Sequence, residues 1–440
     1  MMKILAITAL YPPYHSGGYE IRTKNIMDGL SSRGHEILVI TSQKDASLRL
    51  PEQKANYAIR RKLRIRVGKW DLIDALTRWR ITHILGMSLS FVRELFFDMR
   101  DLEIIDRLIN HFQPDVIYLG HISPLSRTIM PYLADCKIPI VFDEGGSGLL
   151  RTRDEPGILY KFIMYDTNGF WLKNTIKSLV IKFICEISEK RIKSQWVLPG
   201  SMRTIFNSQL NLNNAIKSGL QIYKTSMIHS GIETDKFRFV RKNQISSPVV
   251  ILVPGRILPL KGQIDAIKLL SSLKDREIDA RVIFAGNIWD YSYMKEISLE
   301  IERLNLEDRV TFFSMMTQEH LAMHYQQADI CFFPSYQRTG FSRTPLEAMA
   351  CGCIVISYGN EGSDEIIRDK HNGFIVQAGD YEKVVSTIKE LISSELMVKN
   401  INLNARIDID ECYSMNTYVS QIEEVVKQAA LDVETIREAK

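Results

Sequence analysis

The sequence predicts an α/β protein built from two doubly wound, Rossmann-like domains, each with a parallel sheet covered by helices on both faces. Three observations predict this fold class. The chain has 440 residues, which is too long for one ordinary hydrophobic core and suits two domains of about 200 residues each. Apolar runs of strand length alternate with stretches of helical periodicity, as in a parallel sheet. This alternation starts again after a polar, turn-rich stretch at residues 241–248.

The first half of the chain supplies the elements of the first domain. In chain order we expect a strand at Lys3–Thr8, a helix at Glu20–Arg33, and strands at Glu36–Thr41, Val116–Leu119 and Pro139–Phe142. Residues 50–110 have a helical and basic pattern, with Arg60, Arg61, Lys62, Arg64 and Arg66 close together. This basic run is either a solvated face or a docking face for an anionic membrane or a lipid-linked acceptor.

The second half supplies the elements of the second domain. We expect strands at Val249–Val253, Arg281–Ala285, Val310–Phe313, Ile330–Phe333 and Ile354–Ser357, alternating with helices at Gly262–Leu273, Tyr293–Leu304, Gln318–Gln327 and Pro345–Ala350. Ligands of doubly wound sheets bind at the carboxyl ends of the strands. Two such domains facing each other therefore predict a ligand cleft between them.

The composition excludes several classes of function. Hydrophobic residues make up 45% and charged residues 25% of the chain, as in an ordinary globular protein. The formal net charge of +4 is small for this length and disfavours a nucleic-acid binder. Six cysteines lack the paired spacing of a zinc site, so we expect reduced thiols and no bound metal.

The apolar segments indicate where the protein acts. The apolar run within Met1–Ile7 is too short for a secretion signal, and no run reaches the roughly 20 residues of a membrane span. The helical stretch Trp171–Ile187 carries an apolar stripe that fits core packing, while Trp171 and three lysines leave contact with a membrane surface open. We expect a cytoplasmic protein, either free or peripheral at the inner face of the membrane.

Two segments at expected strand ends have residues that suit an anionic ligand. Gly17 and Gly18 lie between the first strand and the first long helix, where glycine allows a close backbone approach and a helix N-terminus favours an anion. Arg256 and Lys261 follow the strand Val249–Val253, and a guanidinium fork with a mobile ammonium suits a diphosphate. Neither segment is a dinucleotide fingerprint or a P-loop. A plain loop and two surface cations are the structural alternatives.

A third segment, residues 334–353, joins an expected strand to an expected helix through a loop that contains Gly340. Pro345 suits the first helical position, with Thr344 before it. Glu347 stands three residues after Thr344, so it fits a capping box with that threonine. The same carboxylate could instead face a ligand and hold ribose hydroxyls. The local sequence leaves both interpretations open.

The third segment resembles the donor-site signature of the retaining GT-B glycosyltransferases, the large family called glycosyl transferases group 1 (family 4). That signature reads Glu-Gly-Phe-Gly, four residues, and then Glu-Ala-Met-Ala-x-Gly. The matching residues here are Gly340, Phe341, Glu347, Ala348, Met349, Ala350 and Gly352. Other parts of the chain are also similar to the family, namely Tyr11–Gly18 to its glycine loop, Ile228–Phe237 to its interdomain segment, Gly255–Gly262 to its phosphate clamp and Gly373–Val376 to its C-terminal strand.

The resemblance implies a GT-B fold of two facing Rossmann-like doubly wound domains. The implied divisions are an acceptor-binding domain at 1–225, a linker at 226–247, a nucleotide-sugar-binding domain at 248–412, and a C-terminal helix at 413–440 that packs back on the first domain. The implied activity is transfer of a hexose-type sugar from a nucleotide diphosphate sugar to a hydroxyl acceptor with retention. A carbohydrate or lipid-linked acceptor in surface polysaccharide or glycolipid synthesis is the implied setting, without a cofactor or a required metal.

The resemblance also implies roles for particular residues. Arg256 and Lys261 would neutralise the leaving diphosphate, and His121, at the end of the strand Val116–Leu119, would lie near the sugar. These three are the implied catalytic residues. The implied donor-binding residues are Gly17, Gly18, Thr339, Gly340, Phe341, Ser342 and Glu347, with Glu347 on the ribose and the amides near Phe341 and Ser342 on the diphosphate. On its own, a lone histidine such as His121 is more often structural.

Two positions depart from the family signature. Thr339 replaces the first glutamate, which contacts the donor sugar in the family, and Ser342 replaces a glycine. Threonine can form a hydrogen bond but supplies no charge near a developing oxocarbenium ion. Two alternatives therefore stay open: a nucleotide-sugar epimerase of the same fold, and a non-catalytic nucleotide-binding paralogue.

Two further motifs look like metal sites and are interpreted otherwise. Asp408 and Asp410 form a DxD triplet far from the expected strand ends of the second domain. His320 and His324 have helical i, i+4 spacing but lack the glutamate of a zinc-protease motif. We expect neither pair to bind a metal.

Overall fold

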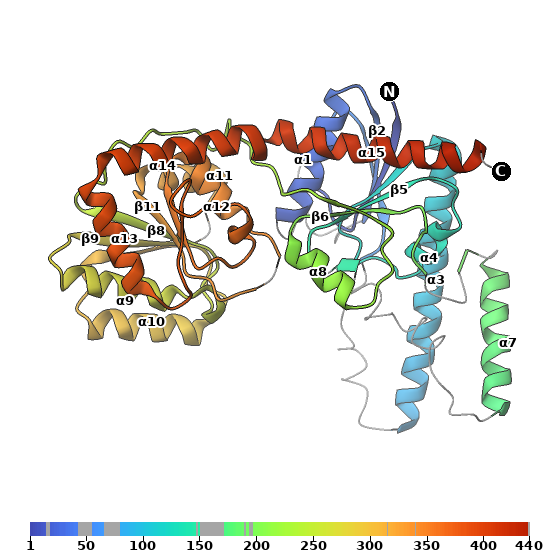
Figure 1. Cartoon of the computed structure of the whole chain (residues 1–440). Coiled ribbons are helices and arrows are strands. Elements are labelled where there is room, and N and C mark those ends of the chain that lie inside the picture. Colours follow the sequence, from blue (N-terminus) through green and yellow to red (C-terminus); the bar gives the residue numbers. More distant parts are fainter. Residues whose placement is uncertain are drawn as a thin grey trace. The chain divides into compact units, whose positions relative to one another are not determined.

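A computed structural model of the chain describes residues 1–14, 18–42, 55–65, 80–146, 148–149, 171–188, 191–192, 197–314, 316–338 and 340–438, with only the backbone for 80–92, 171–177, 180 and 433–438. The chain forms two compact units. The N-terminal unit comprises Met1–Phe206, Asn211–Ile228 and Val419–Lys440, and the C-terminal unit comprises Asn207–Leu210 and His229–Tyr418. Each unit contains one parallel sheet with helices around it (Figure 1), so the predicted α/β fold class is confirmed.

The sheet of the N-terminal unit has seven parallel strands in the order β3-β2-β1-β4-β5-β6-β7. The strands are β1 (Lys3–Ile7), β2 (Glu36–Ser42), β3 (Ala58–Leu63), β4 (Val116–Leu119), β5 (Ile140–Glu144), β6 (Arg203–Phe206) and β7 (Lys224–Met227). The helices are α1 (Gly18–Ser32), α3 (Arg80–Phe112), α4 (Ile129–Ala134), α7 (Trp171–Ile187) and α8 (Gln209–Lys217). The order of the strands reverses between β1 and β4, which places the switch point of the sheet beside the residues that follow these two strands.

The basic run of the N-terminal unit lies partly on a strand. A helical pattern was expected through residues 50–110, and this prediction is wrong at β3. Along β3 the exposed Arg60 and Lys62 alternate with the half-buried Ile59 and Arg61, which is the period of a half-buried strand. The Arg61 guanidinium donates hydrogen bonds to the carbonyl oxygens of Tyr11 and Pro12, so it holds the loop after β1. Position 66 lies outside the described residues.

The sheet of the C-terminal unit has six parallel strands in the order β10-β9-β8-β11-β12-β13. The strands are β8 (Val249–Pro254), β9 (Ala280–Ala285), β10 (Val310–Phe313), β11 (Ile330–Phe333), β12 (Ile354–Ser357) and β13 (Phe374–Ile375). The helices are α9 (Gln263–Lys274), α10 (Tyr291–Arg303), α11 (Gln318–Gln327), α12 (Thr344–Cys351), α13 (Tyr381–Ser393) and α14 (Glu395–Asp408). The predicted strands and helices of this half are confirmed, four of them with the same bounds.

Except for α12, each helix of the C-terminal unit begins where the sequence provides a capping side chain or a glycine. Asp290 and Asp380 accept backbone N–H groups at the first turns of α10 and α13, and Ser394 does the same for α14. Gly262 precedes α9 with a φ of 68°. The apolar faces of these helices then pack on the buried strands β8, β11 and β12 in continuous hydrophobic clusters. Among the described residues, no helix is both long and apolar enough to cross a membrane.

The last helix, α15 (Met415–Glu438), contributes an ion-pair cluster to the N-terminal unit. Glu423 lies 2.8 Å from the Arg33 guanidinium, 2.5 Å from the Lys427 ammonium and 3.2 Å from His35 Nε2. These cations, first Lys427 and then Arg33, lower the pKa of Glu423 from 4.5 to about 2. The cluster therefore stabilises the N-terminal unit most when the carboxylate is ionised.

We expect Glu423→Gln to reduce the free energy of unfolding by about 1–2 kcal/mol at neutral pH, because the Lys427 ammonium and the Arg33 guanidinium lose a charged acceptor. Because the pKa of Glu423 is lower in the folded protein than its ordinary value of 4.5, the ionised carboxylate stabilises the fold at pH values above 4.5. This stabilisation is lost as the pH falls from 4.5 to about 2. The difference between variant and wild type should therefore shrink over that window in urea unfolding. Glu424→Gln is the matched control, since the neighbouring Glu424 is exposed. A difference that did not depend on pH would contradict the prediction.

Candidate functional site

The switch point of the C-terminal sheet brings two of the predicted segments together. β8 and β11 are neighbours in the sheet, and β9 and β12 lie on their outer sides, so the order of the strands reverses between them. The loop after β8 is Gly255–Gly262, and the loop after β11 is residues 334–343. Parallel strands end at the same edge of a sheet, so both loops rise from one edge, where α/β proteins bind ligands.

Glycine is required where these two loops meet. Gly262 has a φ of 68°, and a Cβ atom added there would lie 2.0 Å from the carbonyl oxygen of Pro334. The loops also hold each other by hydrogen bonds, since the Tyr336 amide and the Ser335 hydroxyl both donate to the Leu260 carbonyl oxygen. The backbone around Lys261 is thus fixed from two sides before any ligand binds.

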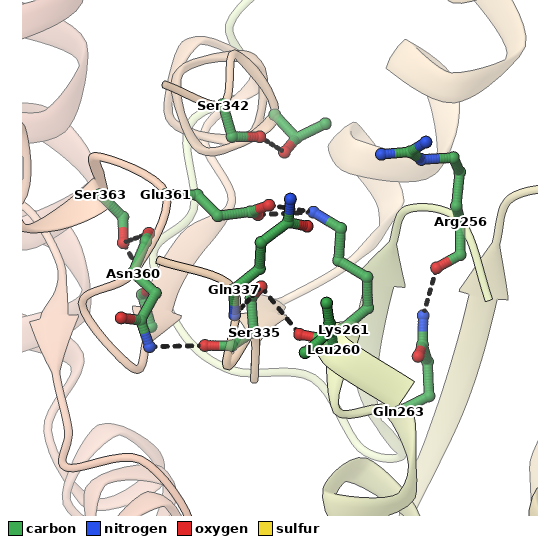
Figure 2. Close-up of polar contacts among 12 residues, drawn as sticks. Arg256, Leu260, Lys261, Gln263, Ser335, Gln337, Ser342, Asn360, Glu361 and Ser363 are labelled. Carbon is green, nitrogen blue, oxygen red and sulfur yellow. Dashed lines mark hydrogen bonds and ion pairs between the residues drawn. The ribbon is translucent and has the colours of Figure 1, made fainter. Parts of the chain in front are cut away.

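The two predicted cations, Arg256 and Lys261, have different surroundings (Figure 2). Lys261 Nζ lies 2.5 and 2.6 Å from the two carboxylate oxygens of Glu361, and both side chains are largely buried. The Arg256 guanidinium lies over the ring of Trp289, 4.2 Å from its centre. Among the described residues, no carboxylate pairs with Arg256. One cation of the predicted clamp is therefore neutralised and the other is available.

The loop after β11 is anchored by the segment that follows β12. The Asn360 amide donates to the Ser335 carbonyl oxygen at 2.7 Å, and the Ser342 amide donates to the Glu361 carbonyl oxygen at 2.8 Å. The predicted use of the Ser342 amide for a diphosphate therefore competes with an existing hydrogen bond. Gly340 has a φ of 69°, and no atom of the described residues lies within 4 Å of its missing Cβ, so its place in this loop is explained by backbone conformation. Thr339 lies outside the described residues.

Glu347 does not form a capping box. α12 begins at Thr344, its N-cap is Arg343, and no side chain caps it. The Glu347 carboxylate is buried instead, where it accepts a hydrogen bond from the Tyr325 hydroxyl at 3.4 Å and lies 4.0 Å from the Arg343 guanidinium. Burial raises the pKa of Glu347, and Arg343 and Tyr325 partly oppose this rise. The capping interpretation is wrong because the helix begins one residue earlier than a capping box with Thr344 requires.

The N-terminal unit holds His121 and Gly18 at its own switch point. His121 follows β4, and its Nδ1 lies 3.3 Å from the buried Glu20 carboxylate of α1. Its Nε2 lies 2.9 Å from the Ser123 hydroxyl. A carboxylate only accepts hydrogen bonds, so Glu20 favours the tautomer with the proton on Nδ1. Gly18 is the first residue of α1, and Gly17 lies outside the described residues.

Three residues at the strand ends were not predicted. Glu361 and Trp289 contact the two clamp cations, as described above. Glu144 ends β5 and accepts hydrogen bonds from the backbone amides of Gly146, Gly148 and Leu149, and burial raises its pKa to about 7. A Glu-Gly-Gly sequence after a strand could have pointed to Glu144. No local pattern marks Glu361.

The two metal-like motifs have structural partners. Asp408 accepts hydrogen bonds from the Arg368 guanidinium and the Asn372 amide, and Asp410 pairs with Arg406. The His324 ring packs 4.7 Å from the ring of Phe313, and burial lowers the pKa of this histidine. The described residues include no cluster of three side chains that could hold a metal ion.

Comparisons with known proteins match the C-terminal unit to one family. Residues 235–408 match the family model of glycosyl transferases group 1, and they all lie in the C-terminal unit. An uncharacterized glycosyltransferase of Methanocaldococcus jannaschii is 24% identical over 433 residues, which is 97% of this chain and 98% of that protein. The capsular polysaccharide biosynthesis glycosyltransferase CapM of Staphylococcus aureus is 22% identical over 352 residues, which is 78% of this chain and 84% of that protein.

The fold is also found in solved structures. The sucrose-phosphate synthase of Thermosynechococcus elongatus superposes with a TM-score of 0.65 at 15% identity, over 97% of this chain and 99% of that one. At this identity the likeness concerns the fold alone. The C-terminal unit therefore contains a glycosyl transferases group 1 domain, and the two parallel-sheet units have the GT-B fold.

Proposed function

We propose that the chain transfers a hexose-type sugar from a nucleotide diphosphate sugar to a hydroxyl acceptor, with retention of the anomeric configuration. The observation that carries the proposal is the pair Arg256 and Lys261 at the switch point of the sheet in the group 1 domain. A diphosphate that leaves the sugar carries away the electron pair of the broken C1–O bond, and two cations at that place stabilise the developing charge. The acceptor hydroxyl forms the new C1–O bond from the same face of the sugar, and its proton passes to the departing diphosphate.

The same pair supports a reaction without a required metal. Arg256 supplies a fixed fork for two phosphate oxygens, and Lys261 supplies a mobile point charge. Together they can take the place that Mg²⁺ holds in many phosphate sites. Sugar transfer that persists in excess chelator would agree with this proposal, whereas transfer that stops and returns with Mg²⁺ would contradict it.

The remaining predicted residues have proposed roles only. Glu347 would hold the ribose, and Gly340 and Phe341 would line the donor. The resemblance to the family supports these roles, as it does those of Gly17, Gly18, Thr339, Ser342 and His121. The name of the Staphylococcus aureus relative supports a setting in surface polysaccharide or glycolipid synthesis, with a carbohydrate or lipid-linked acceptor.

A thermal-shift screen against UDP, GDP, ADP and their common sugars tests donor binding. A ligand present at a hundred times its Kd stabilises the folded protein by about 2.7 kcal/mol. The screen should therefore show a rise in melting temperature with one nucleotide family. No rise with any of them would contradict the donor-site proposal. An isotope-labelled donor followed by NMR of the product then tests retention, and an inverted linkage would rule it out.

The same experiments separate the two alternatives. A nucleotide-sugar epimerase would release an altered sugar or nucleotide without any acceptor. A non-catalytic paralogue, which Thr339 suggests, would bind nucleotide and turn over no donor. Activity that depends on an added acceptor favours the transferase over both.

We further propose that α7 contacts an anionic membrane surface. Leu179, Phe183 and Ile187 are spaced four residues apart, so they lie on one face of α7, and the side chains of the first two are more than half exposed. Ile184, at the side of this row, is buried and packs in the core of the N-terminal unit. A row of exposed large apolar side chains is unusual for a protein surface and typical of interfacial helices with neighbouring lysines such as Lys182.

Flotation with lipid vesicles tests this contact. We expect the wild type to float with vesicles containing phosphatidylglycerol and the variants Leu179→Asp and Phe183→Asp to bind at least about tenfold more weakly, because each loses roughly 1.5–3 kcal/mol of apolar burial and adds a negative charge. Ser178→Asp adds the same charge to an exposed neighbouring position of α7 and is the matched control. Equal flotation of all four proteins would contradict the proposal.

A further inference from the structure

The ion pair between Lys261 and Glu361 joins two loops that are 100 residues apart in the sequence. The carboxylate accepts hydrogen bonds from the ammonium through both oxygens, and the two side chains are only 16% and 12% exposed. Figure 2 shows the two side chains pointing toward each other from opposite sides. This geometry is tighter than that of an incidental surface pair, whose partners are usually exposed and mobile.

The backbone of Glu361 is held in an unfavourable conformation. Its φ is 60°, in the left-handed region that costs a residue with a Cβ atom about 1–2 kcal/mol. The surroundings hold it there, since its carbonyl oxygen accepts the Ser342 amide and the next residue, Gly362, packs against Phe341. The segment after β12 is thus built to present a carboxylate to the ammonium of the clamp.

A carboxylate and a phosphate compete for the same ammonium. Both are anions that accept charge-assisted hydrogen bonds, and each repels the other when they are close. While Lys261 is paired with Glu361, the two side chains together carry no net charge. Arg256 lies over Trp289 and stays available, so an arriving anion would meet one open cation and one that is already paired.

We propose that Glu361 is an internal competitor of the diphosphate, which occupies Lys261 in the empty site and is displaced when a diphosphate binds. This inference rests on the proposed donor site. Its consequence is selectivity for charged ligands. A ligand with enough negative charge to replace the Glu361 carboxylate forms an ion pair with Lys261, whereas a nucleoside without phosphates does not. A second consequence is faster release of the nucleotide diphosphate product, because the carboxylate returns to Lys261 as the product leaves.

Isothermal titration of the full chain with inorganic pyrophosphate tests the inference. It is repeated with the nucleotide diphosphate that gives the largest thermal shift and with its nucleoside. Glu361→Gln should bind both phosphate ligands about tenfold more tightly than the wild type, since they no longer displace a charged partner. Affinity for the nucleoside should not change. Glu382→Gln is the matched control, because Glu382 also pairs with a cation, Arg276, on a helix outside the proposed site.

A second variant guards against misfolding. Glu361→Gly removes the carboxylate and suits the positive φ at this position, so it should fold at least as well as the wild type and bind pyrophosphate as tightly as Glu361→Gln. Equal or weaker binding of pyrophosphate by both variants would overturn the inference and make Glu361 a residue that positions Lys261.

The outcomes separate this inference from the proposed function. If both variants bind pyrophosphate more tightly but neither they nor the wild type bind a nucleotide, the competitor role stands and the donor-site proposal fails. If wild type and variants bind the nucleotide diphosphate equally well, the donor site stands and the competitor role fails. If no protein binds either ligand, both are overturned.

Discussion

Replacing Arg256 by alanine is expected to lower kcat/KM for sugar transfer by about 10² to 10³-fold, the usual effect of removing one preorganised donor from a developing anion. Arg256 is the clamp cation with no carboxylate partner among the described residues, so its charge is fully available to a leaving diphosphate. Its guanidinium is already held over the Trp289 ring, which reduces the entropy lost when a ligand binds. Steady-state kinetics on the donor identified by thermal shift would measure the effect.

Two further variants define the cause of the Arg256 effect. Arg256→Lys keeps the charge and loses the fork of the guanidinium, so it should recover only part of the activity. Arg303→Ala removes an exposed arginine of α10 that pairs with Glu300 and should leave activity unchanged. Circular dichroism should show all three variants folded. Full activity of Arg256→Ala would mean that this residue does not meet the leaving group.

The sequence predicted the elements of the C-terminal unit well because each buried strand is a continuous apolar run. β11 and β12 consist of Ile330–Phe333 and Ile354–Ser357, and both were predicted with these bounds. β7 has the sequence Lys-Thr-Ser-Met and lies at the edge of its sheet, where no second neighbour buries it. The formation of β7 depends on its pairing with β6, and its own sequence contains little of the pattern from which a strand can be predicted. The basic β3, at the opposite edge, was missed for the same reason.

The candidate site was predictable only in part. Glycines and cations directly after a strand can be recognised from local sequence, which is how Arg256 and Lys261 were found. The partner of Lys261 could not be found in this way, because Glu361 is brought to it by the packing of two loops after different strands. The burial of Glu347 under Tyr325 likewise depends on how α11 and α12 pack, and a capping box is read from four residues alone. Contacts between distant segments therefore account for what was missed.

Gly352→Ala is expected to lower the free energy of unfolding of the C-terminal unit by about 2–4 kcal/mol. Gly352 ends α12 with a φ of 87°, a conformation that costs alanine about 1 kcal/mol or more. A Cβ atom there would also lie 2.1 Å from the carbonyl oxygen of Val240. That oxygen is part of a backbone fixed by the hydrogen bond from the Val240 amide to the Cys351 carbonyl, so it cannot move aside freely. Urea unfolding followed by circular dichroism would measure the loss.

Gly340→Ala is the matched control, because Gly340 also has a positive φ, of 69°, but none of the described residues comes within 4 Å of its missing Cβ. Gly340→Ala should lower the free energy of unfolding only by the cost of the positive φ for alanine, about 1 kcal/mol. Equal losses for the two variants would show that the Val240 carbonyl yields and that close packing does not explain Gly352. Both glycines match the family signature, but for different physical reasons. Gly352 is required by close packing and a positive φ, and Gly340 by its positive φ alone. The folded fraction of Gly352→Ala should therefore bind nucleotide normally, whereas Arg256→Ala should keep its stability and lose transfer.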